Sequence, residues 1–318
     1  MTPLITVVIP VYNGEKTIAT TLQSVLNQTL SELEILIIND GSQDRTLPIL
    51  QQFQDARIQI HSFPNAGLSA SRNRGLKLAQ ADYLSFIDAD DLWTENKLAA
   101  QYQALLANPQ AAVAYSWTSF INERGDFLYA GRSEKAQGRV YQDLLVYNFL
   151  ENGSNALIRT QSLKEIGGFD ESLDTAEDWD TFLKLAACYD FVNVPQAQIL
   201  YRISAASMSA QIEKQAQGTL TVIQQAFQQN PNLPQSLKNL ALANNYVYLT
   251  IKALEGQPNR YRSRLAARYW LQIIHYQPRW LKQRGKLMTI FLIKILVSLL
   301  FPTKLAQTIL HKLKQSQS

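Results

Sequence analysis

The first third of the chain alternates short apolar runs with amphipathic segments. Residues 6–9 form a continuous β-branched run, as expected of a strand that is buried on both faces of a parallel sheet. Runs at 33–38 and 58–61 predict two further strands. The segments between them, 18–26 and 47–53, place apolar residues at helical spacing. This alternation of strands and helices predicts a doubly wound α/β sheet.

A fourth strand is predicted at residues 83–87, and it ends in three acids, Asp88, Asp90 and Asp91. Carboxylates that cluster at a strand end suit a hard divalent cation, which prefers oxygen ligands. The alternative is that one acid caps a helix beginning near Leu92. One cap needs one side chain, so three acids within four residues favour a binding site at this end of the sheet.

Before that strand, a loop at 64–75 runs into a helix that Ser69 is placed to cap. Beyond residue 100 the pattern is less regular, and a later helix begins near residue 175 with an acidic first turn. We predict a strand at 113–117, a mobile glycine-containing loop at 122–138, and a loop that enters a strand at 153–158. From about residue 211 helical periodicity continues to the end, so we expect an α/β domain over 1–209 and a helical region over 210–318.

Residues 287–301 are apolar except for Thr289, Lys294 and Ser298. A spanning helix needs about 20 apolar residues, which this segment does not reach. A helix lying in the membrane interface and a buried or dimer-forming helix both remain open, and both are favoured over a span.

Charge is distributed unevenly along the 318 residues. Residues 256–318 carry twelve Lys and Arg and no acid, although the net charge of the whole chain is only +4. This basic segment predicts an anionic partner, and its interleaved apolar runs favour a membrane surface over nucleic acid. The single cysteine, Cys188, cannot form an internal disulfide, and the N-terminus reads as a strand rather than a secretory signal. We therefore expect a cytoplasmic protein. The basic segment further predicts peripheral attachment to the inner face of a membrane.

A series of short motifs resembles the family-2 glycosyltransferases of the GT-A fold. Asp-x-Asp alone is a weak signal, but the motifs occur in order and at family spacing over residues 5–209. They are Pro10-Val11-Tyr12-Asn13, Asn39-Asp40-Gly41-Ser42, Asn65-Ala66-Gly67-Leu68-Ser69 with Arg72-Asn73, Asp88-Ala89-Asp90, Gly167-Gly168-Phe169-Asp170, Glu177-Asp178 and Tyr201-Arg202. The resemblance implies a Rossmann-like, mostly parallel sheet flanked by helices, with the C-terminal helices as an extension.

The resemblance also implies how the nucleotide-sugar is bound. It assigns the base to Asp40, whose pocket Pro10 and Tyr12 shape, and it favours a UDP-sugar. Arg72 is placed near the base and diphosphate, where a planar guanidinium suits anionic partners. Arg202 is placed to meet the diphosphate when a nearby loop closes.

The remaining roles implied by the resemblance concern metal and catalysis. Asp88 contacts the ribose, and Asp90 binds a divalent metal, Mn²⁺ or Mg²⁺. Asp178 is the general base of an inverting transfer, with Glu177 orienting it or the acceptor. The alternative for this pair is an acidic first helical turn that complements the helix dipole. Asp91 is a cap or a supporting group rather than a ligand.

The sequence departs from the motifs of related glycosyltransferases at two places, and both bear on the reaction that we expect. Ser204 stands where the family often has a histidine, which puts any contact from that histidine in doubt. Residues 277–280 resemble the Gln-x-x-Arg-Trp motif of processive synthases, but they are one residue short. We therefore expect transfer of one or a few sugars to a glycan or lipid-linked acceptor, in cell-surface polysaccharide or glycolipid synthesis.

Two other readings are weighed against this one. A sugar nucleotidyltransferase would need a Gly-rich, basic phosphate loop after the first strand, and residues 10–14 lack it. A non-catalytic binding or assembly module would be expected to have lost one of the acids at Asp40, Asp88, Asp90 or Asp178, all of which are present.

Overall fold

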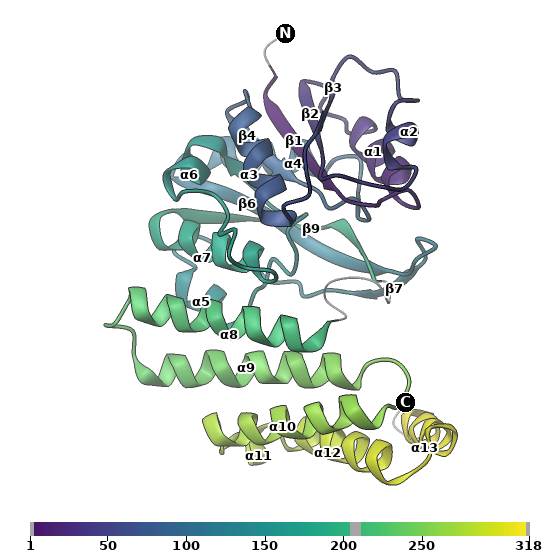
Figure 1. The fold of residues 1–318 in the computed structure, drawn as a ribbon. Helices are drawn as coiled ribbons and strands as arrows, with labels where there is room; N and C mark the ends of the chain where they lie inside the picture. Colours follow the sequence, from purple (N-terminus) through teal and green to yellow (C-terminus); the bar gives the residue numbers. More distant parts are fainter. Residues whose placement is uncertain (1–2, 204–210, 316–318) are drawn as a thin grey trace. The chain divides into compact units, whose positions relative to one another are not determined.

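The computed structural model describes residues 3–203 and 211–315 (Figure 1). The described residues up to 203, other than 145–147, form one compact unit. Residues 145–147 belong with 211–315 in a second compact unit. The predicted boundary at 209/210 falls between the two described ranges and stays a prediction, and Ser204 also lies outside them.

The first unit contains a single nine-stranded sheet. Its strands are β1 Ile5–Val11, β2 Leu33–Asn39, β3 Ile58–Ser62, β4 Tyr83–Phe86, β5 Leu92–Trp93, β6 Ala111–Ile121, β7 Phe127–Ala130, β8 Leu157–Arg159 and β9 Asp190–Arg202. They follow the order β3-β2-β1-β4-β8-β6-β9-β5, with β7 paired to β6. The first four are parallel, whereas β8 runs antiparallel to both β4 and β6. The predicted α/β sheet flanked by helices is confirmed, but the sheet is mixed rather than mostly parallel, because β5, β7 and β8 pair antiparallel with their neighbours.

In the first unit, helices connect and cover these strands (Figure 1). The helices from α8 onward belong to the second unit. In chain order the helices are α1 Ile18–Leu26, α2 Thr46–Leu50, α3 Leu68–Leu78, α4 Lys97–Ala107, α5 Tyr141–Val146, α6 Thr160–Glu165, α7 Glu177–Cys188, α8 Ile212–Gln229, α9 Gln235–Leu254, α10 Arg260–Tyr276, α11 Trp280–Gln283, α12 Gly285–Leu300 and α13 Thr303–Gln315. Every residue of β1 is buried, which explains why that run is apolar throughout.

Two helix-cap predictions are wrong. Leu92 and Trp93 form strand β5, paired with β9, and α4 begins only at Lys97, so none of the preceding acids caps a helix at Leu92. Helix α3 begins at Leu68 after Gly67, whose φ of +91° suits glycine, and Ser69 lies inside it. The buried Ser69 hydroxyl instead donates to the carbonyl of Leu173 at 3.5 Å.

Two differences concern strands. The predicted loop at 122–138 contains β7, which forms a hairpin with β6. The strand β9, thirteen residues long, lies in a segment for which the hydrophobic pattern predicts no element. It pairs in parallel with β6 through several register shifts, and such irregular pairing leaves a weak period-2 signal in the sequence.

The second unit has its own hydrophobic core. Buried residues from α8 to α12 meet there, among them Val247, Ile273, Trp280 and Phe291. Trp280 belongs to the Gln277–Trp280 segment, so a role in packing accounts for it. Within the described ranges, no helix has both the length and the apolar character needed to cross a bilayer.

Candidate functional site

Several of the predicted site residues lie at the carboxyl ends of three neighbouring parallel strands. Val11 at the end of β1 pairs with Asn39 of β2, and Val8 of β1 pairs with Phe86 of β4. Asp40 and Asp88 follow these strand ends, as expected of a ligand crevice in an open α/β sheet.

Pro10 and Tyr12 lie at the same edge. Pro10 is buried within β1 opposite Ile38, and Tyr12 directly follows the strand with 52% of its surface exposed. The backbone N–H of Asn13 donates to the Ser42 hydroxyl, which ties the exit of β1 to that of β2.

Asp40 binds the loop that precedes α3. Its carboxylate accepts hydrogen bonds from the backbone N–H groups of Ala66 and Gly67, and it forms an ion pair of 2.8 Å with Arg74. Gly41 has φ +77°, and a side chain there would meet the backbone of Asn65. The loop and the strand end are therefore fixed to each other by one carboxylate.

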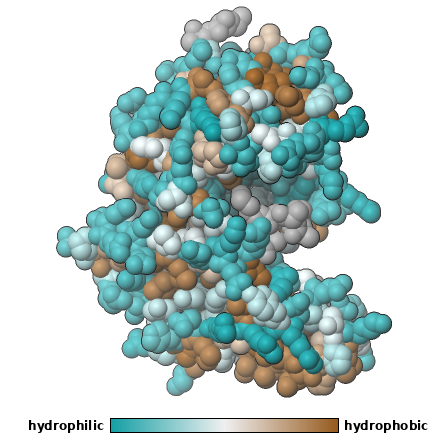
Figure 2. Space-filling model, in the orientation of Figure 1, coloured by the Kyte–Doolittle hydropathy of each residue, from teal (hydrophilic) through white to brown (hydrophobic). Residues whose placement is uncertain are grey.

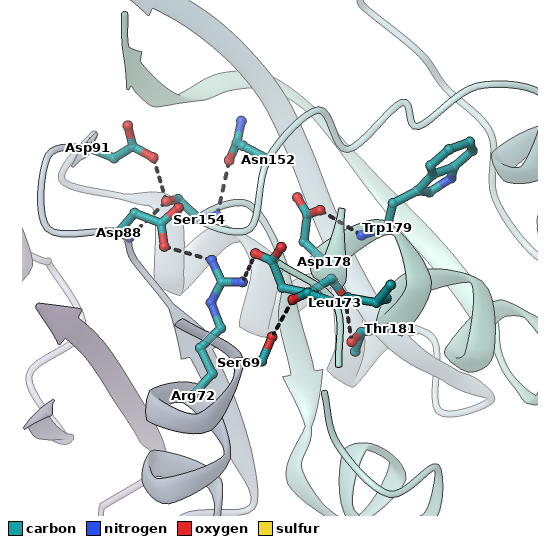
Figure 3. Close-up of polar contacts among 11 residues, drawn as sticks. Ser69, Arg72, Asp88, Asp91, Asn152, Ser154, Leu173, Asp178, Trp179 and Thr181 are labelled. Carbon is teal, nitrogen blue, oxygen red and sulfur yellow. Dashed lines mark hydrogen bonds and ion pairs between the residues drawn. The ribbon is translucent and has the colours of Figure 1, made fainter. Parts of the chain in front are cut away.

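Arg72 is the most constrained side chain of the site. It is 1% exposed, and its two terminal nitrogens each lie 2.7 Å from a carboxylate oxygen, one on Asp88 and one on Glu177. Burial lowers the pKa of Arg72, but the charges of Asp88, Glu177 and Asp178 outweigh it and raise the pKa above the usual range. Figure 3 shows the guanidinium between the acids that follow β4 and the start of α7.

Three consecutive residues of α3 hold three different parts of the site. Arg72 holds Asp88 and Glu177, and Arg74 holds Asp40. Between them, the Asn73 side chain exchanges hydrogen bonds with the backbone of Phe169, each of 2.9 Å. This fixes the Gly167–Asp170 turn, where Phe169 also lies against the Arg72 guanidinium.

Asp91 supports the acids that precede it. It is fully buried, and its carboxylate accepts hydrogen bonds from the Ser154 hydroxyl at 2.5 Å and the Arg202 backbone N–H at 2.9 Å. Ser154 in turn accepts from the backbone N–H of Asp88. Burial is the main cause that raises the pKa of Asp91 well above its ordinary value, and the charges of Asp90 and Asp88 add to it. The interpretation as a supporting group fits these contacts, whereas the cap does not.

Asp90 combines burial with a neighbouring negative charge. Burial first, and the charge of Asp88 second, raise its pKa to about 6. It forms no ion pair with another residue of the described ranges. A hard cation that is bound through one or two carboxylates and the phosphates of its substrate matches this donor set.

Within the part of the chain that the structure describes, protein side chains alone do not form a complete metal site. Residues 3–203 and 211–315 include no group of three His, Cys, Asp or Glu side chains that could hold a metal ion. The acids here fit a cation whose remaining ligands come from a bound diphosphate and water.

Asp178 lies at the second position of α7, beside Glu177. It is partly exposed, and its carboxylate accepts a hydrogen bond of 2.7 Å from the backbone N–H of Trp179. Burial and the charge of Glu177 raise the pKa of Asp178 to about 7, against the opposing effect of Arg72. The two acids therefore differ: Glu177 is buried in an ion pair, and Asp178 has the pKa of a base that works near neutral pH.

Arg202, the last residue of β9, holds backbone groups. Its Nε donates to the carbonyl of Asp90 at 2.7 Å, and Nη1 donates to the carbonyls of Asn122 and Glu123. Arg202 therefore lies beside Asp90, and its contact with a diphosphate stays a prediction.

The structure brings most of the predicted residues together. Arg72, Asp88, Glu177 and Asp178 form one cluster, and Arg202 adjoins Asp90. Asp40 lies at the neighbouring strand end with Pro10 and Tyr12, and it reaches the cluster through α3 rather than by direct contact.

Sequence reasoning missed Arg74 and Ser154. Arg74 follows the motif arginine by two positions on the same helix, and its spacing to Asp40 gives no local signal. Ser154 lies in the loop before β8, and only its small polar neighbours Asn152, Gly153 and Asn155 mark the segment as unusual.

Comparisons with known proteins identify the family. A sequence model of the family described as "Glycosyltransferase like family 2" matches residues 6–253. An uncharacterized glycosyltransferase of Rickettsia typhi is 30% identical over 194 residues, which is 59% of this chain and 61% of the relative. The chondroitin synthase of Pasteurella multocida is 29% identical over 188 residues, covering 58% of this chain and 19% of that enzyme. The chain thus matches less than two thirds of the length of either relative.

Two solved structures share the fold. A mannosyltransferase from Pyrobaculum calidifontis, in complex with GDP-Man and Mn²⁺, aligns with 95% of this chain and 88% of its own, with a TM-score of 0.59 and 19% identity. S. aureus TarS 1-349 in complex with UDP-GlcNAc aligns with 93% of this chain and 81% of its own, with a TM-score of 0.55 and 17% identity.

Proposed function

The chain belongs to the family-2 glycosyltransferases and has the GT-A fold, and on that basis we propose that it transfers a sugar from a nucleotide-diphosphate donor to an acceptor hydroxyl with inversion at the anomeric carbon. One observation carries this proposal. Arg72 joins Asp88, at the strand edge where a nucleotide would lie, to Glu177, the neighbour of Asp178. Groups for donor binding and for proton removal therefore share one site.

Asp178 is the proposed general base. Inverting transfer is a single in-line displacement: the acceptor oxygen bonds to the anomeric carbon as the bond to the diphosphate oxygen breaks. The acceptor proton passes to the Asp178 carboxylate, and the electron pair leaves with the nucleotide diphosphate. A partly exposed carboxylate with a pKa of about 7 suits this step, whereas Glu177 is held by Arg72 and orients its neighbour.

The proposed donor is a UDP-sugar, with a GDP-sugar as the second candidate. The two solved neighbours carry UDP-GlcNAc and GDP-Man, which supports the donor class without selecting the sugar. Asp40, Pro10 and Tyr12 would contact the base. Asp88 would contact the ribose, while Arg72 and Arg202 would act near the diphosphate.

A divalent cation, Mn²⁺ or Mg²⁺, would be held by Asp90 together with the donor phosphates. Such an ion offsets the negative charge that develops on the leaving nucleotide. Asp91, Ser154 and Arg202 hold the backbone and side chains around Asp90 in place.

The acceptor and the pathway are proposed from the relatives. One matched relative, from Pasteurella multocida, is named a chondroitin synthase, which supports a glycan acceptor. We propose a glycan or lipid-linked acceptor in cell-surface polysaccharide or glycolipid assembly, with the enzyme on the cytoplasmic side.

The test is donor binding and hydrolysis across UDP-, GDP- and dTDP-sugars, with Mn²⁺ and with chelator. We expect metal-dependent binding of one nucleotide-sugar and its loss in Asp90→Ala. Asp82→Ala is the matched control, because Asp82 is an exposed acid at the opposite end of β4. Failure of the folded protein to bind any donor would contradict the proposal. Binding without hydrolysis or transfer would favour the non-catalytic module.

A further inference from the structure

Helix α12 has two apolar faces. Met288, Phe291 and Ile295 enter the core of the second unit and are nearly inaccessible to solvent. Leu292, Leu296 and Leu300 recur at intervals of four and therefore lie along one side of the helix, which faces solvent. A surface helix ordinarily presents polar residues on the side away from the core.

The exposed apolar surface continues past the end of α12. Phe301 directly follows Leu300, and Leu305 lies in the first turn of α13. We call Leu292, Leu296, Leu300, Phe301 and Leu305 the leucine strip; their exposed fractions run from 37% to 69%. Figure 2 shows hydrophobic surface gathered at the lower edge, where α12 and α13 lie in Figure 1. Single exposed leucines are ordinary, whereas a continuous strip marks an interaction surface.

Basic side chains accompany the strip. Lys286, Lys294 and Lys304 are exposed on the same two helices, and no acidic residue occurs between 256 and 318. In the rest of the second unit that the structure describes, the acids are Glu213 and Glu255, which contact Tyr261 and Lys252. The two helices that carry the strip therefore also carry exposed positive charge, with no negative charge nearby in the sequence.

The length of α12 decides how it could meet a membrane. Sixteen residues make a helix of about 24 Å, which is shorter than the roughly 30 Å of a bilayer's hydrocarbon core. Its core-facing side is also occupied by the rest of the unit. A helix of this kind lies in the plane of the interface, with leucines among the acyl chains and lysines at the headgroups.

The charge around the strip also distinguishes between two possible partners, a second copy of the chain and an anionic membrane. A second copy of the chain, docked through the same strip in a two-fold dimer, would bring the lysines of both copies to one interface. Like charges at an interface oppose association, whereas anionic headgroups attract each of these lysines.

We propose that the leucine strip is a docking surface for an anionic bilayer and that it holds the protein on the membrane without spanning it. The family match ends at residue 253, before this surface begins. The proposal does not depend on the donor, the metal or the catalytic base.

The test is co-sedimentation of the full chain with vesicles of phosphatidylcholine alone and of phosphatidylcholine with phosphatidylglycerol. We expect binding to the anionic vesicles that weakens as salt is added, because ions screen the lysines. Leu296→Glu should weaken binding by about tenfold or more, since it removes apolar burial and adds a repelled charge. Leu106→Glu is the matched control, because Leu106 on α4 is 47% exposed and Leu296 is 45% exposed.

Circular dichroism would establish that both variants are folded. Absence of vesicle binding by the wild type, or equal binding by Leu296→Glu and wild type, would overturn the proposal. A stable dimer in solution that Leu296→Glu dissociates would also overturn it, by assigning the strip to a second copy.

Discussion

Arg72 and Glu177 form an ion pair of 2.7 Å although 105 positions separate them in the sequence. The same guanidinium holds Asp88 at 2.7 Å, so one buried cation accounts for two of the clustered carboxylates. Asp178 lies beside this pair without an ion-pair partner among the described residues, and its pKa is raised to about 7. The charge arrangement thus distinguishes the two neighbouring acids of α7.

Replacing the proposed base should reduce turnover and spare donor binding. Asp178→Asn keeps the shape of the side chain but cannot accept the acceptor proton. We expect kcat to fall by about 100- to 10,000-fold, the usual contribution of a general base. Single-turnover kinetics and donor titration would check this, and unchanged kcat would exclude Asp178 as the base.

The pH dependence of the reaction should report the same group. Because the base acts when deprotonated, kcat should rise with pH through about 7 and then level off. Glu177→Gln removes a negative neighbour that raises the pKa of Asp178, so this limb should move to lower pH. A pH–rate profile for each protein tests the sign, and a shift to higher pH in Glu177→Gln would contradict the electrostatic account.

Loss of the buried cation should destabilise the first unit. Arg72→Met leaves Glu177 buried and Asp88 partly buried without their partner, so the free energy of unfolding should fall by about 3 kcal/mol. Arg57→Met removes an ion pair whose two side chains are 26% and 28% exposed, and it should cost less than about 1 kcal/mol. Denaturant titration of both variants makes the comparison, and equal losses would show that the buried pairs are not formed.

Gly153 should tolerate no side chain. A Cβ at this position would lie 2.4 Å from Nη2 of Arg72, and the two ion pairs prevent that group from moving away. We expect Gly153→Ala to cost about 1–3 kcal/mol in unfolding free energy.

The matched control for Gly153→Ala is Gly285→Ala at the start of α12, where an added Cβ meets no atom within 4 Å. This change should be neutral or stabilise the protein by up to about 1 kcal/mol. Thermal unfolding of the two variants provides the measurement. An unaffected Gly153→Ala would mean that the Arg72 side chain can rearrange.

The hydrophobic pattern located the first four parallel strands because each is a local apolar run. It did not locate β5, since two residues carry no period, nor β9, whose pairing with β6 depends on residues about 80 positions away. The acids at 88–91 could be recognised as a site, but assigning Asp91 required knowledge of Ser154 and Arg202. Those contacts join segments that are distant in sequence, and no local spacing encodes them.

The structure establishes where the site residues lie, whereas their chemical roles stay predictions. The proximity of Arg72, Asp88, Glu177 and Asp178 is a structural finding. Base recognition by Asp40, metal binding by Asp90 and proton removal by Asp178 stay predictions for the experiments above.

The three contacts of Arg72, Asn73 and Arg74 also bear on how this segment could change in length. One residue of α-helix turns the chain by about 100°, so a single insertion or deletion within α3 before residue 72 would redirect all three side chains together. Asp40, the Phe169 turn and the two carboxylates that Arg72 holds would lose their partners in one step. Substitutions at exposed positions such as Lys77 alter none of these contacts. The segment should therefore accept changes of residue far more readily than changes of length.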